Sequence, residues 1–156
     1  MKTRAAVLHT LDLKAPFAET KPLKIEEIEL DEPGAGEVLV KMTAAGLCHS
    51  DLSVITGVRP RPVPMALGHE ASATVLKVGD GVSNLKAGDR VVLVFVPSCG
   101  NCMPCQEGRP ALCEPGAEAN GKGTLLSGAR RLHLGQQAVN HHVGVSAFAE
   151  HAVVSS

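Results

Sequence analysis

The sequence has 156 residues, a formal net charge of −1 and an apolar fraction of 44%, so we expect one domain with a real core. Balanced charge and three Phe as the only aromatic residues disfavour a nucleic-acid partner, because they leave neither a basic surface nor a base-stacking platform. No apolar run reaches the roughly 18 residues of a membrane span, and the N-terminal apolar stretch is too short for a signal peptide. We therefore expect a cytoplasmic protein with no membrane partner.

Short β-strands dominate the prediction, because apolar side chains alternate with polar ones between turns rich in Gly and Pro. The segments expected to be strands are residues 4–9, 23–30, 37–45, 71–78, 90–96 and 147–154. A phase slip at Glu26 and Glu27 predicts a bulge in the second of these strands. Residues 114–141 are rich in Gly and poorly periodic. The pattern predicts a mainly β domain of the barrel or sandwich class.

One short helix is expected after the third strand. Ser50 and Asp51 are predicted to cap this helix, which runs through Ile55. Alternate prolines remove backbone donors from residues 59–64, so that segment is expected to be an extended loop that leads to residues 68–70. No G-x-G-x-x-G motif follows a predicted strand, which argues against a Rossmann unit within these residues.

Four of the five cysteines lie in one loop with the spacing C-x2-C-x2-C-x7-C. They are Cys99, Cys102, Cys105 and Cys113. Disulfides or unrelated free thiols are the alternatives, but the odd cysteine count argues against a fully paired framework. The loop has too little apolar content to fold by burial, and four thiolates around a tetrahedral Zn²⁺ would replace the missing core. We predict a structural-zinc lobe over about residues 97–115, with no open coordination position for catalysis.

Cys48, His69 and Glu70 form a second candidate metal site. Taken singly, a Cys after a strand is more often a small buried hydrophobe, and a His before a strand is more often a hydrogen-bonded core or surface group. A helix start beside Cys48 favours its thiolate form. Asp51 could accept a hydrogen bond from the His69 ring nitrogen that faces away from a metal. The residues alone leave both interpretations open.

Together, these motifs resemble the zinc-dependent medium-chain alcohol dehydrogenases. The segments that carry the resemblance cover nearly the whole chain in the family's order: residues 46–51, 68–70, 88–91, 99–113 and 148–151. The resemblance implies that residues 1–156 form the N-terminal GroES-like catalytic domain, a partly open β-barrel with short helices and a structural-zinc lobe. It also implies an oxidoreductase that converts an alcohol to an aldehyde or ketone. In such enzymes zinc lets an alkoxide form near neutrality, and hydride passes to NAD or NADP.

The resemblance also implies roles for individual residues of the second site. Cys48 and His69 match catalytic zinc ligands, and Glu70 matches a carboxylate that lies beside the metal or acts as an alternate ligand. Ser50 matches the hydroxyl that takes the proton of the alcohol. Asp51 matches the group that orients His69.

The remaining positions concern the cofactor, the proton relay and the substrate. His49 matches a basic residue near the cofactor pyrophosphate. Many relatives continue the relay with a histidine that this segment lacks, so a relay through Ser53 must end in a hydroxyl or in water. The residues expected to line an apolar cleft for a small-molecule alcohol or aldehyde are Leu52, Val54, Ile55, His142, Val143 and Phe148.

The family pattern continues past residue 156 with a nucleotide-binding domain and a further metal ligand. We therefore expect this chain to be an isolated catalytic domain, inactive by itself, that binds the structural zinc tightly and the catalytic zinc weakly. The full-length parent is expected to be a homo-oligomer. Two alternatives are a stand-alone GroES-like interaction module with only a structural zinc, and a zinc-ribbon-like module that binds nucleic acid. Metal occupancy at Cys48 and His69 distinguishes the first alternative from the dehydrogenase.

Overall fold

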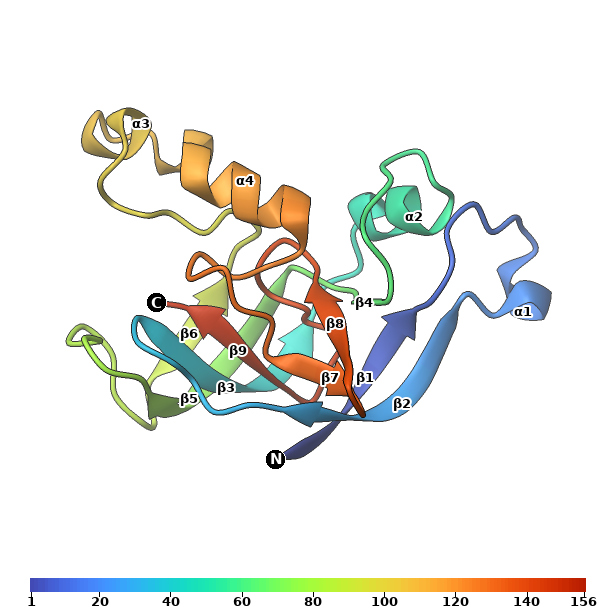
Figure 1. Cartoon of the computed structure of the whole chain (residues 1–156), viewed down its shortest axis with the longest axis horizontal. Helices are drawn as coiled ribbons and strands as arrows, with labels where there is room; N and C mark the ends of the chain where they lie inside the picture. Colours follow the sequence, from blue (N-terminus) through green and yellow to red (C-terminus); the bar gives the residue numbers. More distant parts are fainter.

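The computed structural model describes residues 1–156, and Figure 1 shows a β-rich body with α2, α3 and α4 along one side. The strands are β1 (Lys2–Leu8), β2 (Leu23–Leu30), β3 (Glu37–Ala45), β4 (Met65–Ala66), β5 (Ala71–Val78), β6 (Arg90–Leu93), β7 (Leu132–Leu134), β8 (Gln137–His141) and β9 (His151–Ser155). The helices are α1 (Phe17–Thr20), α2 (His49–Ile55), α3 (Met103–Gln106) and α4 (Glu114–Lys122), with a 3-10 turn η1 (Pro110–Leu112). The mainly β prediction is confirmed. None of these helices is long and apolar enough to cross a bilayer.

The strands form a barrel and a second sheet. The barrel closes in the order β1-β2-β7-β8-β4, and the four-stranded sheet has the order β6-β5-β3-β9. β4 closes the ring by pairing antiparallel with β1 and parallel with β8. The barrel is therefore closed rather than partly open. The closing strand has only two residues, and its pairing begins at Met65, directly after Pro64, which has no backbone N–H.

β3 joins the two sheets through the core. Leu39 points into the barrel core, whereas Val38 and Val40 pack against the other face with Ala152 and Val154 of β9. Because successive side chains of a strand point to opposite faces, both faces of β3 are buried at this point. The same strand ends three residues before Cys48, so packing of β3 in the core fixes the position of the segment that carries Cys48.

β2 forms without the predicted bulge. Its pairing with β1 is continuous, from Lys2 opposite Glu29 to Leu8 opposite Leu23. Glu26 and Glu27 both reach solvent, where they pair with His9 at 2.8 Å and Lys2 at 2.6 Å. The phase slip in the sequence therefore reflects a part of β2 that is open to solvent on both faces, not an inserted residue.

Residues 114–141 form α4, β7 and β8 although their sequence is poorly periodic. α4 is only weakly amphipathic, and its first turn depends on Cys113, whose sulfur accepts a hydrogen bond from the Gly116 N–H at 3.3 Å. A Cβ on Gly116 would lie 2.1 Å from the Pro97 carbonyl oxygen, so the helix needs glycine for this close approach. These are tertiary contacts that hydrophobic periodicity does not report.

The largest differences in strand boundaries are at β6 and β9. β6 ends at Leu93 rather than at residue 96, and β9 begins at His151 rather than at residue 147. Residues 147–150 instead cross the barrel: the N–H groups of Ala147 and Phe148 donate to the carbonyls of Gly68 and Leu67, each at 2.9 Å. This crossing brings the C-terminal part of the chain against the segment that carries His69.

Candidate metal centres and active site

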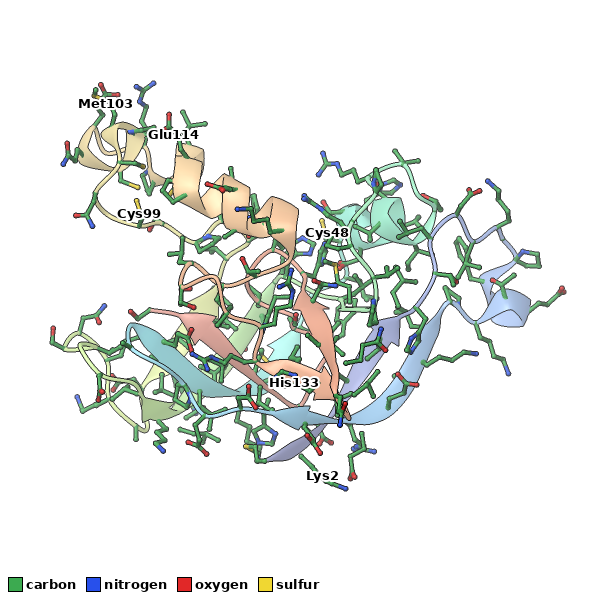
Figure 2. The ribbon with its side chains drawn as sticks, viewed as in Figure 1. Lys2, Cys48, Cys99, Met103, Glu114 and His133 are labelled. Carbon is green, nitrogen blue, oxygen red and sulfur yellow. The ribbon has the colours of Figure 1, made fainter.

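The cysteines form two separate centres. Figure 2 shows Cys48 beside α2, whereas Cys99 lies in the lobe that also carries Met103 of α3 and Glu114 of α4. All five cysteines are free thiols. The two centres are therefore considered in turn.

The four predicted lobe cysteines converge, with all their sulfur atoms within 4.8 Å of one another. Cys113 is completely buried, and its sulfur accepts from the Cys99 N–H at 3.2 Å as well as from Gly116. Cys99 accepts from the N–H groups of Asn101 at 3.5 Å and Cys102 at 3.3 Å. Backbone donors thus surround a cluster that has almost no apolar packing of its own.

The chemistry of this cluster fits a divalent cation. Hydrogen bonds from the backbone of Asn101 and Cys102 lower the pKa of Cys99 to about 6. Desolvation and the neighbouring Cys102 raise the pKa of Cys105 to about 12, so without a metal the four sulfurs cannot all be thiolates. Zn²⁺ prefers four thiolates in a closed tetrahedral set and would remove that repulsion.

The second centre brings Cys48, His69 and Glu70 together, with one ligand atom of each within 4.8 Å of the others. His69 is almost completely buried, and its Nε2 lies 3.6 Å from Oε1 of Glu70, whose side chain is 47% exposed. Cys48 is half-buried at the start of α2, and His69 precedes β5. One thiolate, one imidazole and one carboxylate form a donor set that suits zinc with a position left open.

Asp51 contacts both Cys48 and His69 from the buried side of this centre. Its side chain is buried, and Oδ1 accepts from the Gly68 N–H at 2.9 Å and lies 3.3 Å from His69 Nδ1. Its other oxygen accepts from the Cys48 N–H at 3.3 Å. With the proton on Nδ1 facing Asp51, the lone pair of His69 Nε2 points toward Cys48 and Glu70.

The start of α2 differs from the predicted cap. Cys48 is the N-cap residue, and Asp51, in the third helical position, accepts from its backbone N–H. The prediction that Ser50 caps the helix was wrong, because Ser50 already lies inside the first turn. Gly68 has φ +91°, and a Cβ there would lie 2.5 Å from the Phe148 nitrogen, so glycine is needed beside Asp51.

His142 also contacts Asp51, which the sequence did not suggest. Its Nδ1 lies 3.1 Å from Asp51 Oδ1, without the alignment of a hydrogen bond, and its ring meets that of His69 edge to face at 5.0 Å. Burial alone would raise the pKa of Asp51, but His142, His69 and the Gly68 N–H together hold it below its ordinary value. Asp51 is therefore a buried carboxylate shared by two imidazoles.

A cavity of about 220 Å³ opens at this centre. Its lining residues are Cys48, Ser50, Val54, Arg59, Arg61, His69, Glu70, Phe95, His142 and Val143. Of the residues expected to line a cleft, Val54, His142 and Val143 do so. Leu52 does not line it, and Ile55 and Phe148 instead pack into the apolar cluster beneath α2. Larger and more open hollows elsewhere contain neither Cys48 nor His69.

Three lining residues escaped the sequence analysis: Arg59, Arg61 and Phe95. Alternate prolines predicted an extended loop but not the direction of its arginine side chains. Val143 has φ +45°, an uncommon conformation for a β-branched residue, at the edge of the same cavity. Backbone strain of this kind is concentrated at functional sites.

Ser50 and His49 occupy different positions relative to the cavity. Ser50 lines it, with its hydroxyl oxygen 3.5 Å from the Cys48 sulfur. His49 is exposed and does not line it; its Nδ1 lies 3.4 Å from the hydroxyl of Ser53. The two residues therefore face different surroundings although they are adjacent in the sequence.

Comparison with known proteins agrees with this geometry. The S-(hydroxymethyl)glutathione dehydrogenase of Escherichia coli O1:K1 / APEC is 40% identical over 156 residues, which are 99% of this chain and 40% of that protein. An alcohol dehydrogenase zinc-binding domain protein from Burkholderia ambifaria has 33% identity and a TM-score of 0.87, over 99% of this chain and 40% of the other. Benzyl alcohol dehydrogenase from Acinetobacter calcoaceticus has 32% identity and a TM-score of 0.84, over 99% and 39%.

This chain thus spans about 40% of the length of the curated relatives it matches. The family model of the alcohol dehydrogenase GroES-like domain matches residues 34–156, which include both cysteine centres and the cavity. With the closed barrel, the zinc-type donor sets and these relatives in agreement, the chain belongs to the alcohol dehydrogenase GroES-like domain family.

Proposed function

We propose that this chain is the catalytic-domain portion of a zinc-dependent alcohol dehydrogenase, which oxidises an alcohol to an aldehyde or ketone with NAD or NADP. The observation that carries the proposal is the convergence of Cys48, His69 and Glu70 at a cavity that Ser50 also lines. The named relatives support the same reaction class, since they are an S-(hydroxymethyl)glutathione dehydrogenase and a benzyl alcohol dehydrogenase.

Cys48, His69 and Glu70 would hold the catalytic zinc. Zinc bound there would supply a Lewis acid that lowers the pKa of an alcohol hydroxyl. Asp51 keeps the Nδ1 proton of His69 in place and leaves Nε2 free to act as a ligand. Glu70 is half exposed and adjoins His69 Nε2, so its carboxylate can serve as a ligand or as a neighbour of the metal.

Ser50 is the proposed acceptor of the proton released by the alcohol. Its hydroxyl lies next to Cys48 and faces the cavity, and a hydroxyl can accept one proton while it donates another. From Ser50 the proton would pass to water or toward the hydroxyl of Ser53, which lies beside His49. His49, outside the cavity, is the proposed contact for the cofactor pyrophosphate, and the cofactor accepts the hydride.

The four-cysteine lobe has a separate, structural role in this proposal. Four sulfur ligands complete a tetrahedral shell, so an alcohol has no position on that metal. The lobe leads directly from the loop after β6 into α4. We expect this site to bind zinc tightly and the site at Cys48 to bind it weakly.

The test is metal binding, measured on the chain and on two variants by elemental analysis and by competition with a chromophoric chelator. Cys99→Ala should lose the tightly bound zinc and keep the weak site, whereas Cys48→Ala should lose only the weak site. Two equally tight zincs after dialysis would contradict the expected difference in affinity. If the unsubstituted chain binds a single zinc that Cys48→Ala does not affect, the proposal is wrong and the interaction module with one structural zinc remains.

A further inference from the structure

Two arginines share the cavity with the candidate metal ligands. Arg59 and Arg61 come from the proline-rich loop before β4 and line the same space as Cys48, Ser50 and His69. Neither guanidinium has a carboxylate within salt-bridge distance. In contrast, Arg131 pairs with the buried Glu37 at 2.8 Å, which shows how this chain neutralises an arginine that has a structural role.

Arg61 is held in place without being neutralised. It is half-buried, and its Nη1 donates to the backbone carbonyl of Asn120 in α4 at 3.2 Å. Asn120 is itself buried, and its side-chain amide donates to the carbonyl of Phe95 at 3.1 Å. Because a guanidinium has five N–H donors and this contact uses one, most of the donors of Arg61 stay available.

Arg59 is the second arginine that lines the cavity, and it is exposed to solvent. Pro60 separates the two arginines, and Pro62 follows the second, so the loop carries both side chains on a backbone with restricted φ. Arg59 makes no side-chain hydrogen bond within the chain and is exposed to solvent. The pair therefore presents two permanent cations to the cavity.

The other charges of the cavity do not offset these cations. Glu70 is its one lining carboxylate and adjoins His69 at the metal centre, while Asp51 lies buried behind His69. Apolar side chains of Val54, Phe95 and Val143 complete the lining. Guanidinium groups bind planar carboxylates in a bidentate geometry, and unpaired ones in a cavity favour an anionic ligand.

We propose that Arg59 and Arg61 bind the carboxylate of the substrate, so that this domain acts on an alcohol or aldehyde that also carries a carboxylate on an apolar spacer. The claim that the hydroxyl of this substrate reacts beside Cys48 depends on the proposed function. The claim that an anion binds in the cavity depends only on the two arginines. A phosphate of the dinucleotide is the other source of negative charge. The substrate is favoured because the arginines share the cavity with Cys48 and Ser50, while His49 lies outside it.

The first experiment measures anion binding without a metal at the second centre. Benzoate is titrated into Cys48→Ala chain with zinc in the four-cysteine site, and NMR chemical shifts report the dissociation constant. Arg59→Gln and Arg61→Gln should each weaken benzoate binding about 10-fold, as expected for loss of a charge-assisted hydrogen bond. Arg90→Gln is the matched control, because Arg90 is exposed, unpaired and lines a different hollow from the cavity at Cys48.

The second experiment compares 4-(hydroxymethyl)benzoate with benzyl alcohol in the chain that holds Co²⁺ at Cys48. The cobalt–thiolate absorption reports binding near the metal. The carboxylate-bearing alcohol should bind about 10-fold more tightly, and the double arginine variant should lose this preference. If both alcohols perturb the spectrum with equal affinity, the inference is wrong while the proposed function stands.

Two further outcomes separate the remaining explanations. If neither alcohol perturbs the cobalt signal but benzoate binding depends on both arginines, the anion site stands and the proposed function fails. A parallel titration with inorganic phosphate tests the cofactor as the source of charge. If the arginine variants weaken phosphate binding and leave benzoate binding unchanged, the arginines serve the dinucleotide and the substrate proposal is overturned.

Discussion

Replacing Asp51 by Asn tests whether this carboxylate positions His69 for metal binding. The side chain is 6% exposed and accepts from the Gly68 N–H at 2.9 Å and the Cys48 N–H at 3.3 Å, in addition to its contact with His69. Asparagine keeps the shape but removes the negative charge that holds the His69 proton, and it turns one acceptor into a donor. Loss of such a partner lowers metal affinity about 10- to 100-fold, or about 1.4 to 2.7 kcal/mol.

The assay is zinc competition with a chromophoric chelator, with the four-cysteine site filled beforehand as an internal reference. Asp80→Asn is the control, because Asp80 is exposed in the segment between β5 and β6 and does not line the cavity. In a His69→Ala background, Asp51→Asn should cost little additional affinity, since the group that it orients is gone. Equal zinc affinity of Asp51→Asn and the unsubstituted chain, within about twofold, would refute the positioning role.

Three further predictions concern stability and the lobe. Cys113→Ser should abolish tight zinc binding and expose the lobe to cleavage by the Glu-specific protease Glu-C after Glu107, because a buried ligand is lost; limited proteolysis with mass spectrometry checks this. Glu37→Gln should lower the free energy of unfolding in urea by about 3 kcal/mol by leaving Arg131 unpaired. Burial alone would raise the pKa of Glu37, but its hydrogen bonds hold it below the ordinary value, so the difference should shrink as pH falls below about 4. Burial lowers the pKa of His141 to about 4, so the unfolded chain binds the extra proton and stability should rise by up to about 3 kcal/mol from pH 4 to 6.5; His141→Gln should flatten this slope.

Local sequence patterns were sufficient for the features that depend on neighbours in the chain. The alternation of apolar and polar residues predicted most strands, because successive side chains of a strand point to opposite faces and every second one is buried. Cysteine spacing predicted which four sulfurs would meet, because a short loop leaves them few other arrangements, and they lie within 4.8 Å. Contact of Asp51 with His69 followed from a motif rather than from spacing, and the structure places the two side chains together at 3.3 Å.

Other features depend on contacts between segments far apart in the chain. α4 carries little periodicity and forms where Gly116 packs against the Pro97 carbonyl, so a pattern of its own residues could not reveal it. The two-residue β4 closes the barrel only because β1 and β8 meet on either side of it. His142 reaches Asp51 because residues after β8 cross beside Gly68.

By itself, therefore, the sequence determined the class of fold and the four cysteines of the lobe, which follow from local spacing and residue chemistry. The donor set of the second centre came from the resemblance to a family, because spacing alone left Cys48 and His69 open to other interpretations. Only the tertiary structure decided what surrounds that centre. The extended loop at residues 59–64 was predictable, but whether Arg59 and Arg61 point to solvent or toward Cys48 depends on where α4 and Phe95 lie. Several segments that are far apart in the chain line this cavity, so the charge of its lining cannot be predicted from any one of them.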